Sequence, residues 1–125
     1  MTLYQMYLLN EAWSAEKVIT IELDHKFTTI KGRDIFKSYL KDYIVTDIDD
    51  NYAYCRSGCG ENKTITLYNL HLMNNQWHDN TEIILFTLFE SLQYIVTGND
   101  ILNKRIPEFE VESFDGNYIC VKNLN

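Results

Sequence analysis

The residues best suited to chemistry are cysteines and histidines near a glycine-rich stretch. Cys55 and Cys59 are separated by three residues, and His71 and His78 follow them along the chain. Thiolate sulfur and imidazole nitrogen are ligands that zinc prefers, but the usual thiol pairs have two or four intervening residues. Cys55 and Cys59 are therefore a candidate zinc pair for which ordinary free cysteines are the simpler interpretation. We expect no bound metal and no other cofactor.

The acidic segment around Asp47, Asp49 and Asp50 has the carboxylate spacing with which a calcium-binding EF-hand loop begins. The later positions of that motif do not match, because the sixth would be Tyr52 instead of glycine and the twelfth Gly58 instead of glutamate. We interpret the segment as an acidic turn.

Known catalytic motifs are not found in the sequence. It has no Gly-x-Ser-x-Gly, no His-Glu-x-x-His and no glycine loop of the kind that binds phosphates. His25 follows Asp24, and an imidazole can activate a cysteine, but three histidines and three cysteines allow many such pairings by chance. We therefore expect a protein that is not an enzyme.

Acidic residues suggest a binding surface instead. Glu108, Glu110 and Glu112 alternate, so on a strand all three would project from one side, roughly 6.6 Å apart. That spacing is close to the spacing of successive phosphates in a nucleic-acid strand. The simpler alternative is a solvated strand face, or an edge strand whose charges discourage aggregation. Asp47, Asp49 and Asp50 form a second acidic cluster.

Basic residues are fewer, and they suggest a different kind of site. Arg33, Lys37 and Lys41 would share one face of a helix, and Arg105 lies in a short basic pair. An anionic small molecule held between sheet and helix is the alternative hypothesis. Its candidate residues are Arg33, Lys37, Arg56 and Arg105.

Composition limits the remaining possibilities. The 125 residues are 46% hydrophobic and 23% charged, which argues against disorder and favours a single domain over 1–125. A net charge of −7 argues against direct nucleic-acid binding. An odd cysteine count, with no signal sequence and no membrane-spanning run, predicts a cytoplasmic protein that does not contact membranes.

Hydrophobic periodicity predicts an α+β fold, with a mainly antiparallel sheet and two α-helices at about 33–43 and 80–97. The second helix has the cleaner pattern, and we expect it to pack across a sheet face. We detect no internal repeat. The predicted strands cover 3–9, 18–23, 44–48, 52–56, 63–73, 109–114 and 118–121, and 27–30 is either a further strand or a lead-in to the next element.

These features together favour a small acidic protein that binds another protein with a basic surface. We expect it to inhibit a nucleic-acid-processing enzyme by occluding its basic site, as a toxin-immunity or anti-defence protein would. The predicted contact residues are the two acidic clusters, with exposed tyrosines and Trp13 as aromatic anchors. A homodimer is possible.

Overall fold

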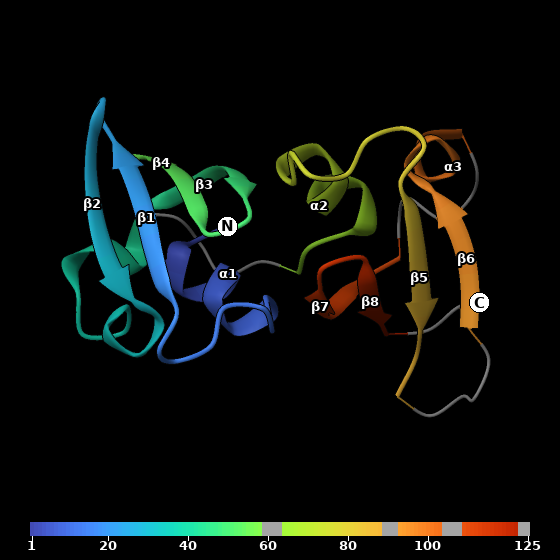
Figure 1. Cartoon of the computed structure of the whole chain (residues 1–125), viewed down its shortest axis with the longest axis horizontal. Coiled ribbons are helices and arrows are strands. Elements are labelled where there is room, and N and C mark those ends of the chain that lie inside the picture. The colour runs from blue at the N-terminus through green and yellow to red at the C-terminus, as the bar shows by residue number, and fades with distance from the viewer. Residues whose placement is uncertain (59–63, 89–92, 104–108, 123–125) are drawn as a thin grey trace. The chain divides into compact units, whose positions relative to one another are not determined.

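The computed structural model describes residues 1–58, 64–88, 93–103 and 109–122. The chain forms two compact units, Met1–Lys63 and Thr64–Asn125, each with its own sheet (Figure 1). Whether the two units associate into the single domain predicted over 1–125 is not tested by this division, so that expectation stays a prediction. Each unit is therefore described by itself.

The N-terminal unit begins with a helix, α1 (Leu3–Leu9), capped by the Thr2 hydroxyl, which accepts a hydrogen bond from the Gln5 N–H at 3.1 Å. Strands β1 (Val18–Leu23) and β2 (Lys26–Lys31) form a hairpin, and β3 (Ile44–Asp49) and β4 (Tyr52–Arg56) form another. The 3₁₀ helices η1 (Gly32–Asp34) and η2 (Tyr39–Asp42) lie between the hairpins in sequence. The sheet order is β2-β1-β4-β3, with β1 and β4 parallel.

The C-terminal unit repeats this arrangement. Helix α2 (Leu67–Met73) precedes the hairpin of β5 (Glu82–Phe86) and β6 (Gln93–Thr97), and α3 (Gly98–Asn103) follows it. The hairpin of β7 (Val111–Asp115) and β8 (Tyr118–Val121) completes the sheet, in the order β6-β5-β8-β7. Strands β5 and β8 are parallel.

The two units are an internal repeat in sequence as well as topology, so the expectation of no repeat is wrong. Segment 1–23 corresponds to 65–87, 31–36 to 97–102, and 44–56 to 110–122. The identical pairs are Thr2/Thr66, Leu3/Leu67, Tyr4/Tyr68, Leu8/Leu72, Asn10/Asn74, Trp13/Trp77, Ile19/Ile83, Gly32/Gly98, Asp34/Asp100, Ile35/Ile101, Val45/Val111, Asp49/Asp115, Asn51/Asn117 and Tyr52/Tyr118.

Equivalent hydrogen bonds stabilise each unit from within. The indole N–H of Trp13 donates to the carbonyl oxygen of Asp50 at 2.9 Å, and that of Trp77 donates to Gly116 at 3.3 Å. These bonds tie the segment after each first helix to the turn between the last two strands. The Asn51 and Asn117 side chains donate in the same way to the first residue of β1 and of β5.

The two predicted α-helices do not form where they were expected. The chain nevertheless contains both helices and strands, as an α+β fold does. Two short 3₁₀ helices, η1 and η2, take the place of the helix expected at 33–43, and β5 and β6 occupy most of 80–97. In β5 the burial alternates, with Ile83 and Leu85 buried and their neighbours partly exposed, which is the two-residue period of a strand. The β-branched residues of 82–97 also favour strands over helix.

Two predicted strands are helices instead. Segments 3–9 and 63–73 contain α1 and α2, each begun by a threonine cap at Thr2 or Thr66. The strands predicted at 18–23, 27–30, 44–48, 52–56, 109–114 and 118–121 are confirmed with small changes at their ends. The single antiparallel sheet is replaced by two mixed sheets, because a parallel pair joins the hairpins of each unit.

Candidate protein-binding surface

One face of the N-terminal sheet is buried, and the other is open. Ile19, Ile21, Ile48 and Ala53 point into the core and are almost fully buried. Residues between them in the strands point the opposite way, because side chains alternate along a strand. Strand register then shows which of these side chains are neighbours.

Two rows of side chains cross this open face. In one row Asp49 is paired with Tyr52, Tyr52 with Thr20, and Thr20 with Thr29. In the other, Asp47 is paired with Tyr54, Tyr54 with Glu22, and Glu22 with Phe27. We call these rows the acidic face, which consists of Thr20, Glu22, Phe27, Thr29, Asp47, Asp49, Tyr52 and Tyr54.

Aromatic and acidic groups are interleaved on the acidic face. Phe27 is 65% exposed and Tyr52 is 46% exposed, while Tyr54 is partly buried. Glu22, Asp47 and Asp49 lie on either side of the tyrosines, and neither row contains a Lys or Arg. His25 Nδ1 lies 4.0 Å from a Glu22 carboxylate oxygen, at the end of the β1–β2 hairpin. The surface offers carboxylates beside aromatic contact area.

The aspartates of the second predicted cluster therefore fall into two groups. Asp47 and Asp49 lie on β3 and share the acidic face, whereas Asp50 belongs to the turn after it. Asp50 has a positive φ of 54°, and its carbonyl oxygen accepts the Trp13 bond. Sequence reasoning missed Glu22 and Tyr54, although their alternation with buried residues in 18–23 and 52–56 was a usable signal.

The first predicted cluster does not form a regular row. β7 begins at Val111, and its register with β8 shifts between Val111 and Ser113, so Glu112 is the extra residue of a β-bulge. Glu110 lies before the strand, 3.4 Å from the Lys122 ammonium group. Glu108 lies outside the described residues. The uniform alternation expected for the three glutamates is thus interrupted at the bulge.

Trp13 is not an exposed anchor, which corrects that prediction. Its side chain is only 3% exposed, because the indole ring packs into the core while its N–H reaches the Asp50 carbonyl oxygen. Trp77, the equivalent residue of the second unit, is buried in the same way.

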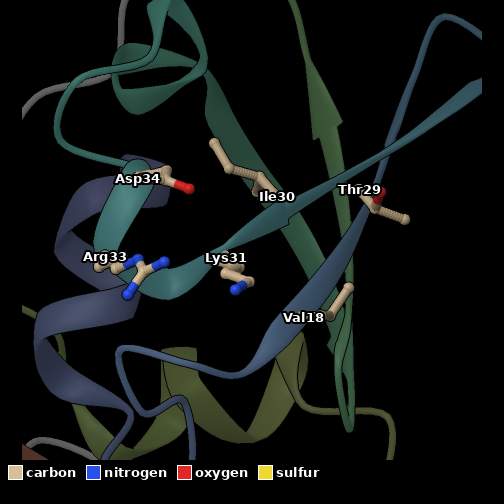
Figure 2. A pocket seen from close by; sticks show the side chains of 6 residues that line it. All are labelled: Val18, Thr29, Ile30, Lys31, Arg33 and Asp34. Carbon is tan, nitrogen blue, oxygen red and sulfur yellow. The ribbon is translucent and has the colours of Figure 1, made fainter.

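The cations of the alternative ligand site are not gathered in one pocket. Arg33 and Lys31 both pair with Glu16, and they line an open depression of about 410 Å³ beside β1 and β2 (Figure 2). Lys37 and Arg56 are exposed and do not line it, and Arg105 lies outside the described residues. The depression's remaining lining residues are Val18, Thr29, Ile30 and Asp34.

The candidate zinc pair has one described member. Cys55 is buried, and burial raises the pKa of its thiol to about 12, which disfavours the thiolate form that binds metals. Cys59 lies outside the described residues. In the described part of the chain, no three His, Cys, Asp or Glu side chains are grouped so that they could hold a metal ion.

Comparisons with known proteins do not assign this fold. No protein-family model matches the chain, and neither curated proteins nor solved structures include a significant match. Among the described residues, no helix has both the length and the apolar character needed to cross a membrane.

Proposed function

We propose that the protein acts by binding another protein through the acidic face of its N-terminal unit. The observation that supports this most directly is the pairing of Asp47 with Tyr54 and of Asp49 with Tyr52 across β3 and β4. Carboxylates attract a basic partner over a distance, and the adjacent aromatic rings provide area that is desolvated on contact. The partner class is a protein with a Lys- and Arg-rich surface.

Comparison of the two units supports a functional origin for the acidic face. Core positions keep their apolar character, as Ile19 and Ile83 or Ile48 and Phe114 do. On the open face, Asp49 and Tyr52 recur as Asp115 and Tyr118, whereas Glu22 is replaced by Phe86 and Asp47 by Ser113. The C-terminal sheet has uncharged residues at the positions of Glu22 and Asp47, and we attribute these two carboxylates of the N-terminal unit to partner recognition.

Within this class we propose an inhibitor of a nucleic-acid-processing enzyme. Such an enzyme holds phosphates with Lys and Arg, and a rigid sheet of carboxylates competes for the same groups. The protein would occlude the basic site without chemistry of its own, as a toxin-immunity or anti-defence protein does. The net charge of −7 accelerates encounter with such a target.

The test is capture of the partner from a lysate of the source organism or its host, using three forms of the full chain. Wild type should retain a basic nucleic-acid-processing enzyme and inhibit it at equimolar ratio. The Asp47→Lys/Asp49→Lys variant should lose both effects. Asp115→Lys, which changes the equivalent of Asp49 in the other unit, is the matched control and should behave as wild type. Equal capture by all three forms would contradict the proposal.

The second candidate is a binder of small anionic ligands at the depression beside Lys31 and Arg33. It ranks lower because both cations are already paired with Glu16. Recovery of no protein in the capture experiment, together with a small anion carried by the purified chain, would favour it.

A further inference from the structure

Strand β6 is the edge strand of the C-terminal sheet in the described part of the chain. Within the described residues it pairs only with β5, and no described strand pairs along its other side. Its five residues carry no charge, and Tyr94 and Ile95 are 48% and 67% exposed. Exposed apolar edges of this kind are sites of strand addition.

The equivalent edge of the N-terminal unit is protected. Strand β2 begins and ends with a lysine, and Lys31 corresponds to Thr97 in β6. Thr29 likewise corresponds to Ile95. Charged residues, lysine above all, are a common device that keeps an edge strand from pairing. The repeat thus has one edge that discourages pairing and one that lacks this protection.

The apolar character of β6 continues across its sheet. Ile95 is paired with Ile84, and Ile84 with Tyr118, which is 49% exposed. This row occupies the positions that Thr29, Thr20 and Tyr52 hold in the acidic face. Pairing along β6 would therefore extend a partly apolar sheet face as well as its hydrogen-bond ladder.

We propose that β6 pairs antiparallel with β6 of a second copy of this chain, so that the protein is a homodimer. Antiparallel self-pairing is a two-fold, isologous contact, which closes after two copies. A charged partner is drawn to the acidic face, whereas two copies with a net charge of −7 approach most easily along an uncharged edge.

The test measures the mass of the full chain by light scattering on a size-exclusion column across a dilution series. Wild type should be a dimer that dissociates on dilution. Ile95→Lys places like charges at the contact and should weaken association by more than about tenfold. Thr29→Lys, at the equivalent position of β2, is the matched control and should leave the dimer intact.

Circular dichroism must show that each variant is folded, and Tyr94→Lys on the opposite side of β6 replaces Ile95→Lys if that variant unfolds. Because the contact is uncharged, high salt should not dissociate the dimer, unlike binding at the acidic face. A wild-type chain that is monomeric at every concentration, or an Ile95→Lys chain that dimerises as wild type does, would overturn the proposal. Loss of the dimer in Thr29→Lys would do the same, because the contact would then involve β2.

Discussion

At the scale of single residues, the sequence predicted which side chains could bind a partner more readily than which side chains lie beside them in the fold. Asp47 and Asp49 were identified as acidic binding candidates from sequence, and they do share one sheet face. Glu22 and Tyr54 were missed because β1 and β4 lie far apart in the chain and meet only in the sheet. Trp13 was placed at the surface for the same reason, since its hydrogen-bond partner belongs to a distant turn.

His71 should make stability depend on pH. Its ring is largely buried and stacks near Trp77, and its Nδ1 has no hydrogen-bond partner in the described structure. Burial lowers the pKa of His71 below its usual 6.5, while the Asp79 carboxylate opposes this in part. The unfolded chain therefore takes up the proton first, and stability falls as pH drops below about 6.5 until the folded pKa is reached.

The measurement is urea unfolding between pH 8 and about pH 5. His71→Tyr introduces the residue found at the equivalent position 7, and it should remove this part of the pH dependence. His25→Asn is the control, because the His25 side chain is fully exposed. A wild-type slope that survives in His71→Tyr would show that another group is responsible.

At the scale of elements, local patterns predicted six strands but failed where two periodicities overlapped. Segment 80–97 satisfies a helical pattern, but its ends, Glu82–Phe86 and Gln93–Thr97, are also short apolar runs that contain β-branched residues, which favour strands. The predicted helix ends at about residue 97, whereas in the structure a different helix, α3, begins at Gly98. The sequence alone could not distinguish one helix from two strands here, because the packing that decides between them involves residues distant in the chain.

Gly98 should be intolerant of any side chain. A Cβ there would lie 2.3 Å from the carbonyl oxygen of His78 and 3.0 Å from Cε1 of His71, so the backbone must shift. We expect Gly98→Ala to lower the free energy of unfolding by about 1–3 kcal/mol, measured by urea denaturation. Gly116→Asp is the matched control. Its positive φ of 60° resembles that of Asp50 at the equivalent turn, and no atom lies within 4 Å of the added Cβ. Equal losses in both variants would contradict the packing explanation.

At the scale of the whole molecule, the repeat is present in the sequence, but the spacing between equivalent residues changes within it. Six residues separate the paired Phe86 and Gln93, whereas four separate the equivalent pair Glu22 and Phe27, so one fixed offset aligns only part of each half. Identical residues such as Gly32/Gly98 and Asn51/Asn117 hold turns and close contacts, whereas the open-face residues Glu22 and Asp47 correspond to Phe86 and Ser113.

Each unit contains its own core and hydrogen bonds, so fragments 1–63 and 64–125 should fold separately. Domains of this size are only marginally stable, so we expect low but cooperative urea transitions by circular dichroism. A full chain that unfolds in one transition, with both fragments unstructured, would show that the units fold only together.

The most direct measurement for the proposed function is the affinity of the captured partner at several salt concentrations, by titration calorimetry. Wild type and Asp115→Lys should bind equally and weaken together as salt increases, while Asp47→Lys/Asp49→Lys should bind more weakly, with a smaller dependence on salt. If the double variant binds as tightly as wild type at every salt concentration, the acidic face is not the binding surface.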